Sequence, residues 1–367
     1  MQNSHKLTSL IPLNAIEPEA LEQLQKALNH DFVKKIAVMP DIHAGYDLPI
    51  GSVALTDSII SPSFVGYDIG CGMCQVKLPD KENIIICDER EAVSIHNRIK
   101  AVVPSGFSSH GAYREYINFT SASEDKKFSS SVNLKIQSQL GTLGGGNHFI
   151  EIGKNKEGDV FITIHSGSRN AGHQVAERYM KIGKYLKLDS EAGKAYERDM
   201  LFMLDYALAN RLDMVKSIVT GVLSYSDQQW KKQILPTLIN ENHNHAEVRA
   251  DGVLHRKGAT PAAKDQLGVI PGNMRDGVYI TRGIGDEKYL NSSSHGAGRV
   301  MSRKNAKSLI SLEEFKNAMK GIAADVSGHT LDEAPFAYKD LDEVIRMQNH
   351  IVVDLVDHVK PLINIKG

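Results

Sequence analysis

Short β-rich runs that end in glycine-rich turns recur along this chain and restrict its fold more than any other feature. They occupy residues 34–55, 63–78, 141–153 and 252–283. The 30 glycines and the aromatic content of 6% suit a fold with many tight turns better than a helical bundle. Hydrophobic residues make up 41% of the 367 residues, which is enough for a sizeable core. We therefore predict an α+β fold built as one large mixed domain over residues 1–367.

Helices are predicted between these runs. Residues 17–30 have helical spacing of Ala20, Leu21, Leu24 and Leu28, residues 173–222 are mostly helical in pattern, and residues 311–326 form a third segment. Residues 80–130 are more polar and are predicted to form a peripheral, mobile insertion. The chain contains no repeat and no clear linker. Two tightly fused lobes are therefore an alternative to one domain.

Charge and cysteine content limit the compartment and the partners. The net charge of -1 gives no global basic field, so a nucleic-acid partner would need a local basic patch. Three cysteines, Cys71, Cys74 and Cys87, form no disulfide framework and fit a reducing compartment. The first residues lack the apolar core of a signal peptide, and no run of 18 apolar residues exists. We predict a cytoplasmic protein without a membrane partner.

One carboxylate, one thiol and three imidazoles are candidate metal ligands. Asp68 and Cys71 are three residues apart in a glycine-flanked turn, His148 precedes an apolar strand, His165 ends another, and His243 begins a polar segment. Asp68 with Cys71, His148 and His165 are each more often structural when taken alone, whereas His243 is equally compatible with a solvated polar loop. Together they suit manganese, zinc, iron or cobalt. Their dispersion does not fit a structural zinc knuckle, whereas a mixed set shared by two ions favours catalysis on phosphate oxygens.

His295 is a candidate nucleophile. It lies in the sequence SSSHGAGR, where small neighbours leave room for a bulky reactant, and a histidine nitrogen can attack phosphorus. Arg299, Arg303 and Lys304 follow it and can meet phosphate. The alternative is a polar turn that caps the next helix. Arg169 lies in HSGSRNAGH, where a strand is predicted to end and a helix to begin, a place that favours an anion.

The glycine-rich sequence GTLGGGN at residues 141–147 fits neither common nucleotide motif. No Gly-Lys-Ser/Thr follows it, and no strand–glycine–helix unit surrounds it.

These segments, in this order, closely resemble the RtcB family of RNA-splicing ligases. The matching stretches are PDIHAGYDLPIGSVA, VGYDIGCGMCQVK, GTLGGGNHFIEI, IHSGSRNAGH, YALANR, HNHAEV, HRKGATPA, IPGNM, SHGAGRVMSR and the terminal IKG. The resemblance runs from about residue 34 to the last residue. It implies a fold with central β-sheets around a dinuclear metal site.

The resemblance also implies an activity: GTP- and Mn-dependent RNA ligation. A histidine attacks GTP to give a histidinyl-GMP intermediate, and GMP then passes to an RNA 3′-phosphate that a 5′-hydroxyl end attacks. A 2′,3′-cyclic phosphate is first opened to the 3′-phosphate. The expected cofactors are two Mn²⁺ ions per chain and GTP. The expected partners are such RNA ends, in tRNA splicing or RNA repair, and an archease-type activator.

Site residues follow from the resemblance position by position. Asp68, Cys71 and His148 correspond to ligands of one manganese, and Cys71, His165 and His243 to ligands of the second. His295 corresponds to the guanylylated histidine. The expected nucleotide contacts are Asn147, Glu151, Asn244, Asn273, Ala297, Gly298 and Lys366, and the expected RNA phosphate contacts are Arg169 and Arg299. Two family serines near the nucleotide are replaced by Asn273 and Val278.

Two other functions remain compatible with part of this pattern. A metal-dependent phosphodiesterase or phosphatase would use the same five ligands without needing His295. A non-catalytic RNA-binding protein would need neither the complete ligand set nor the nucleophile.

Overall fold

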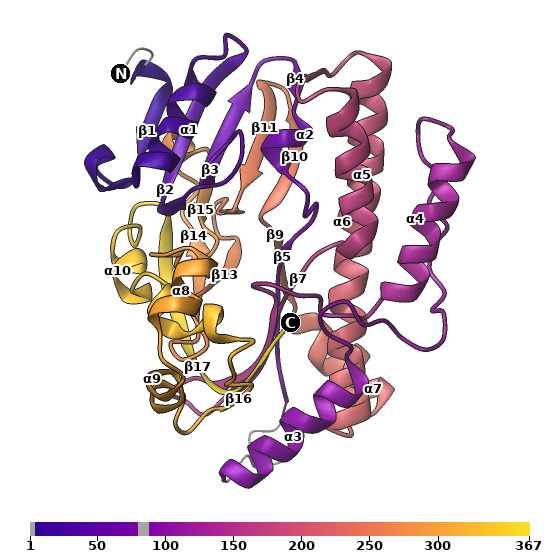
Figure 1. Ribbon diagram of the computed structural model, residues 1–367, viewed down its shortest axis with the longest axis vertical. Coiled ribbons are helices and arrows are strands. Elements are labelled where there is room, and N and C mark those ends of the chain that lie inside the picture. Colours follow the sequence, from indigo (N-terminus) through magenta and orange to yellow (C-terminus); the bar gives the residue numbers. More distant parts are fainter. Residues whose placement is uncertain (1–3, 80–87) are drawn as a thin grey trace.

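Two large β-sheets and a flanking layer of helices make up the fold of this chain in the computed structural model, which describes residues 4–79 and 88–367 (Figure 1). Cys87 and the first part of the predicted insertion lie outside the described residues. The first sheet has the strand order β1 (Leu7–Ser9), β2 (Val33–His43), β3 (Ile50–Thr56), β11 (Gly252–Lys257) and β10 (Asn244–Arg249). It is antiparallel except for the β1–β2 pair.

Helix α1 (Pro18–Leu28) covers part of this first sheet. Leu24 and Leu28 are buried with Ile36 and Val38 of β2 in one hydrophobic cluster. The helix predicted at residues 17–30 is thus confirmed. Strands β2 and β3 pair regularly from Ile36 to Val38, but the register then shifts before His43 pairs with Ile50. The last part of β2, which contains Asp41, therefore leaves the regular ladder.

The second sheet is larger and curls toward a barrel. Its order is β13 (Leu267–Pro271), β14 (Val278–Gly283), β17 (Val353–Lys366), β6 (Phe149–Lys154), β7 (Val160–Ser166), β5 (Gly72–Lys77) and β9 (Ile239–Asn242), with β16 (Ala323–Ala324) beside β17. The edge strands β13 and β9 lie close to each other. Short pairs complete the strands: β4 (Ile59–Ile60) with β8 (Leu186–Lys187), and β12 (Ala259–Pro261) with β15 (Ser292–Ser294).

Two long helices, α5 (Arg169–Ile182) and α6 (Glu191–Lys216), stand side by side along one flank of the sheets (Figure 1). A π-helical turn at Ser217–Val222 extends α6. The prediction that residues 173–222 are mostly helical is confirmed, with a break at residues 183–190 where β8 forms. Met214, Val215 and Ile218 pack against Ile150, Ile162 and Ile164 of the second sheet.

The remaining helices are as long as α5 or shorter. They are α2 (Pro62–Val65), α3 (Glu89–Val102), α4 (Lys126–Gln139), α7 (Asp227–Gln229), α8 (Arg303–Leu309), α9 (Leu312–Ala318) and α10 (Leu341–Arg346), with a π-helical turn at Trp230–Ile234 and single 3₁₀ turns at Ser4–Lys6, Leu13–Ala15, Leu235–Thr237, Glu287–Tyr289, Leu331–Glu333 and Pro335–Ala337. The helix predicted at residues 311–326 is too long. Gly321 adopts a φ of 85°, and the next residues pair with β17 as β16.

Residues 88–130 have two different environments. Ala92, Ile95 and Ile99 of α3 pack into the hydrophobic core of the second sheet. The connection from α3 to α4 instead exposes large side chains, including Phe107 and Tyr113. That residues 80–130 form an insertion stays a prediction.

The described residues form a single mixed α/β domain. Most of their strands lie in two large sheets with shared helical cover, in line with the predicted α+β class. In residues 4–79 and 88–367, no helix combines the length and the apolar character that a bilayer crossing requires.

Candidate metal and nucleotide site

Adjacent ends of four strands in the second sheet gather a thiol and three imidazoles. Cys71 directly precedes β5, His148 directly precedes β6, His165 lies near the end of β7, and His243 directly follows β9. Because β6, β7, β5 and β9 are consecutive neighbours, these ends lie at one edge of the sheet. Residues that are far apart in sequence therefore meet at one place.

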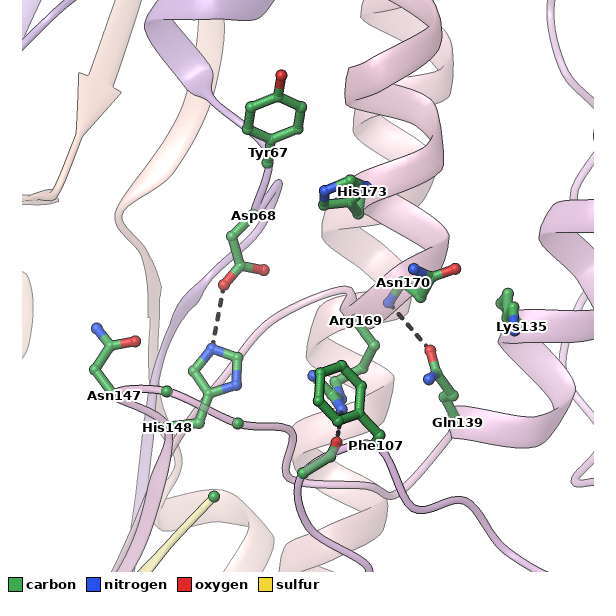
Figure 2. Close-up of a pocket in the computed structure, with 14 residues that line it drawn as sticks. Tyr67, Asp68, Phe107, Lys135, Gln139, Asn147, His148, Arg169, Asn170 and His173 are labelled. Atoms are coloured by element: carbon green, nitrogen blue, oxygen red, sulfur yellow. Dashed lines mark hydrogen bonds and ion pairs between the residues drawn. The ribbon is translucent and has the colours of Figure 1, made fainter. Parts of the chain in front are cut away.

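The distances within this cluster are short enough for shared ligation. The Sγ atom of Cys71 lies 3.4 Å from His148 Nε2 and 3.2 Å from His165 Nε2. Asp68 Oδ2 is 3.1 Å from His148 Nε2, and His165 Nε2 is 3.3 Å from His243 Nε2. The dashed line in Figure 2 marks the contact between Asp68 and His148. The structure thus brings all five predicted ligands together, with Cys71 between the Asp68–His148 pair and the His165–His243 pair. The assignment of two separate metal sites stays a prediction.

Backbone carbonyls fix the orientation of two of the imidazoles. His148 Nδ1 is 2.9 Å from the oxygen of Leu143, and His165 Nδ1 is 3.1 Å from the oxygen of Asn147. A carbonyl oxygen can only accept, so Nδ1 carries the hydrogen in both rings. Each Nε2 then has a lone pair to offer to a metal, which is the usual arrangement for a ligating histidine.

The electrostatics of the cluster fit a bound cation. The donor atoms of Cys71, His148 and His165 all lie within 4.8 Å of one another. Burial lowers the pKa of His165 and of His243 well below the usual range, so both rings are neutral and can ligate. Burial raises the pKa of the Cys71 thiol most strongly, and the negative charge of Asp68 raises it further. A divalent cation would offset that penalty and favour the thiolate.

His295 lies beside this cluster and is held by a buried carboxylate. It follows β15, and its ring centroid is 4.8 Å from that of His243. Its Nδ1 lies 2.6 Å from Asp41 Oδ2, and its backbone N–H donates to the same oxygen at 3.1 Å. Because Nδ1 is engaged with a carboxylate, Nε2 is the nitrogen with a free lone pair.

Asp41 contacts the candidate nucleophile His295, and no motif in the sequence indicated it. Its side chain is fully buried at the irregular end of β2. The ammonium group of Lys339 donates to the carbonyl oxygens on both sides of it, Pro40 O and Ile42 O, each at 3.0 Å. Gly298 approaches the same backbone: its φ is 75°, and a Cβ there would overlap Asp41 O. The only sequence signal was an acidic residue two positions after the apolar run 36–39.

A cavity of about 360 Å³ opens beside His295. Four of the predicted nucleotide contacts line it, namely Asn147, Ala297, Gly298 and Lys366, together with Phe149, Pro271 and Tyr338. Lys366 Nζ lies 2.8 Å from Glu333 Oε2, and both side chains are almost fully buried. Burial alone would raise the pKa of Glu333, but Lys366 and Arg303 lower it to about 2. The cavity wall therefore carries a charged pair.

Three other predicted nucleotide residues lie away from the cavity wall. Glu151 accepts a hydrogen bond from Asn364 Nδ2 at 3.0 Å, and burial raises its pKa to about 8. Asn244 accepts from the N–H of Gly258 at 3.0 Å and donates to Asp68 O at 3.3 Å. Asn273 accepts from the N–H groups of the two residues that close its turn. Val278 is buried in a hydrophobic cluster.

Arg169 and Arg299, the two predicted RNA phosphate contacts, lie in different places. Arg299 lines the cavity at His295, where it donates to Asp332 O at 2.7 Å and to Tyr338 Oη at 3.1 Å. Arg169 lines a second groove, on the side of Asp68 and His148 (Figure 2). Asn147 borders both hollows. The structure therefore separates a hollow at His295 from a hollow at Arg169, with the cluster between them.

Comparisons with known proteins match nearly the whole chain. A family model described as "tRNA-splicing ligase RtcB" matches residues 23–127 and 114–367. RNA-splicing ligase RtcB1 of Escherichia coli strain ATCC 25922 is 30% identical over 393 residues, which cover 96% of this chain and 95% of the relative. RNA-splicing ligase RtcB of Escherichia coli K12 is similarly 30% identical, with 96% and 95% covered. The tRNA-splicing ligase RtcB of Nanoarchaeum equitans is 29% identical, with 91% and 88% covered.

Proposed function

The chain belongs to the RtcB family, and from this premise we propose that it is a GTP- and manganese-dependent RNA ligase. It joins an RNA 3′-phosphate end to a 5′-hydroxyl end through a histidinyl-GMP intermediate on His295. A 2′,3′-cyclic phosphate end is opened to the 3′-phosphate before it is joined. The observation that carries the proposal is the place of His295, which lies between a cluster of metal-binding side chains and a cavity while Asp41 holds its ring.

The first step is a transfer of the guanylyl group. His295 Nε2 attacks the α-phosphorus of GTP, a P–N bond forms, and the bond to pyrophosphate breaks. The imidazole gains positive charge as it attacks, and the buried carboxylate of Asp41 at Nδ1 stabilises that charge. The lone pair of His295 Nε2 makes the attack, so this nitrogen carries no hydrogen when it reacts.

The second and third steps take place on RNA. An oxygen of the RNA 3′-phosphate attacks the phosphorus of the adduct, which breaks the P–N bond, returns His295 and leaves a guanylylated 3′ end. The 5′-hydroxyl of the other end then attacks the RNA phosphorus, forms the phosphodiester and expels GMP. The departing groups are pyrophosphate and GMP, so one GTP is consumed for each phosphodiester that is formed.

The metal-binding cluster fits this chemistry. Asp68, Cys71, His148, His165 and His243 would hold manganese, which supplies charge neutralisation for the phosphates when it is bound. The nucleotide would lie in the cavity at His295, where Ala297 and Gly298 provide a turn without bulky side chains and Lys366 and Arg303 provide positive charge. Asn147 lies at the border where the nucleotide and the RNA end would meet.

A labelling experiment tests the proposal. The protein is incubated with manganese and GTP labelled at the α-phosphorus, and the label that survives denaturation but is lost in acid is counted. Wild type should take up label, and His295→Ala should not. The exposed His350→Ala variant is the matched control and should label like wild type. An unlabelled wild type, or equal labelling of His295→Ala, would contradict the ligase; opening of cyclic phosphates without label would instead indicate a phosphodiesterase.

A further inference from the structure

A second groove, of about 680 Å³, opens at the Asp68 and His148 side of the metal-binding cluster, and His295 does not line it. Asp68 and His148 form one wall, and Arg169, Asn170 and Lys135 lie on the other side of the hollow (Figure 2). The groove therefore leads directly to the cluster where the proposed reaction takes place.

Phe107 is presented to this groove by a fixed loop. Its side chain is fully exposed, at 105% of the reference area. Its backbone neighbour Gly106 is nevertheless anchored, because its N–H donates to Gly144 O at 2.8 Å and its carbonyl oxygen accepts from Arg169 Nη2 at 2.9 Å. Leu143 N–H donates to Pro104 O at 2.9 Å on the same loop. A large apolar ring is thus held in water without a partner from the described residues that line the groove.

A second aromatic surface lies on the same groove. Tyr67 stacks on His173, with ring centroids 4.9 Å apart and planes inclined by 21°, and Tyr46 packs edge-on against Tyr67. Tyr67 and His173 both line the groove, as Figure 2 shows. Flat aromatic faces are the surfaces on which unpaired nucleobases stack, and this stacking tolerates any base.

Positive charge lies beside these rings. Lys135 and Arg169 both line the groove. Arg169 adopts a φ of 55°, an uncommon conformation for a residue that is not glycine. Its guanidinium packs so closely against Gly144 that a Cβ there would overlap it. A guanidinium held in one position beside an aromatic ring suits a phosphate whose neighbouring base is stacked.

We propose that this groove is a subsite for a single-stranded RNA end, with a nucleobase stacked on Phe107 and the adjoining phosphate at Arg169 and Lys135. The inference rests on the proposed function, since it names the form of RNA that the ligase accepts. A base inside a duplex is stacked on both faces, and the paired terminal base of a blunt end offers only its outer face and cannot turn out of the helix toward a side chain. The enzyme therefore selects ends with unpaired terminal nucleotides over blunt duplex ends.

A binding experiment without GTP tests the subsite apart from catalysis. The probes are a short fluorescent single-stranded RNA with a 3′-phosphate, the same RNA with an abasic terminal nucleotide, and a blunt duplex of the same sequence. Loss of one stacked base should weaken binding by about ten-fold. Phe107→Ala should show this loss with the intact RNA. Phe107→Trp keeps an aromatic ring and should bind the intact RNA like wild type. The abasic RNA should bind wild type and Phe107→Ala equally weakly.

Tyr113→Ala is the matched control, because Tyr113 is also exposed on this connection but does not line the groove; it should bind like wild type. The subsite is overturned if Phe107→Ala binds the intact RNA like wild type, or if the substitution weakens the binding of the abasic RNA as much as that of the intact RNA. It is also overturned if the blunt duplex binds wild type as tightly as the single strand does. The labelling experiment with GTP is independent: an unlabelled wild type overturns the ligase, whereas a labelled wild type with unchanged Phe107→Ala binding overturns the subsite alone.

Discussion

One oxygen of Asp41 holds His295 at two points. Asp41 Oδ2 lies 2.6 Å from the ring nitrogen Nδ1 and accepts the backbone N–H of the same residue at 3.1 Å. The two contacts fix both the position of the main chain and the rotation of the ring. The carboxylate is fully buried, so its interaction with the ring is weakly screened by water. The geometry makes Asp41 the group that sets the reactive nitrogen of the proposed nucleophile.

Asp41→Asn should slow the formation of the GMP adduct. The amide keeps the size of the side chain but loses the negative charge that stabilises the imidazole as it becomes positive. We expect a rate loss on the order of 10²-fold, measured as the initial rate of label uptake from GTP. The exposed Asp251→Asn variant is the control and should keep the wild-type rate. An unchanged rate in Asp41→Asn would show that the carboxylate does not assist the attack.

Lys339 is a positioning residue for the Asp41–His295 pair, because it contacts the backbone next to Asp41 and not His295 itself. Its ammonium binds the carbonyl oxygens of Pro40 and Ile42 and so fixes the backbone that carries Asp41. Lys339→Met should lower kcat for adduct formation by about ten-fold. The KM for GTP should stay near the wild-type value, because Lys339 does not line the cavity.

Two further variants separate positioning from a general loss of stability. Lys339→Arg should recover part of the rate, because a guanidinium can donate to both carbonyls. Lys320→Met removes an exposed lysine and should change nothing. A higher KM with an unchanged kcat in Lys339→Met would contradict a positioning role.

The parts of the fold that depend on local sequence could be predicted, whereas the contacts made across the sheets could not. Helix α1 and the strands next to glycine-rich turns could be predicted, because apolar spacing and turn residues determine structure within a few positions of the chain. The end of α9 was predicted too late because the pairing of Ala323 and Ala324 with β17 is a long-range contact. Asp41 and His295 are 254 positions apart, so no motif contains both residues.

The same reason applies within the site. The order β6–β7–β5–β9 brings the candidate ligands together, and that order is a property of the folded sheet. The orientation of His148 and His165 depends on the backbone oxygens of Leu143 and Asn147, whose side chains give no hint of that role. The resemblance to the RtcB family supplied the ligand set, while the structure adds Asp41 and Lys339.

Cys71→Ala should reduce the amount of bound metal more than Cys74→Ala does. Cys71 Sγ lies within hydrogen-bonding distance of His148 Nε2 and of His165 Nε2, so a thiolate there can be shared by two ions. Elemental analysis after dialysis against manganese should find both ions lost. Cys74→Ala is the control, since Cys74 is buried in the hydrophobic core of the second sheet. Two manganese ions per chain in Cys71→Ala would exclude the shared thiolate.

His255 should make the folded protein sensitive to acid through a group outside the metal-binding cluster. It lies on β11, is fully buried and accepts the N–H of Ser61 through Nε2 at 2.9 Å. Burial lowers its pKa from 6.5 to about 4. Between these values the unfolded chain binds a proton that the folded chain does not, so the free energy of unfolding falls as the pH drops from about 6.5 to about 4.

His255→Asn tests this dependence, because the amide oxygen can still accept from Ser61 while the side chain no longer titrates. Urea unfolding of metal-free protein at pH 7.5 and pH 5 measures the difference. The loss of unfolding free energy between the two pH values should be about 2 kcal/mol smaller in His255→Asn than in wild type. Other buried histidines, including His43, whose pKa burial lowers to about 4, contribute equally to both proteins and cancel. The exposed His329→Asn variant should follow wild type. If His255→Asn lost as much stability as wild type between the two pH values, His255 would not be the neutral, buried acceptor that this structure describes.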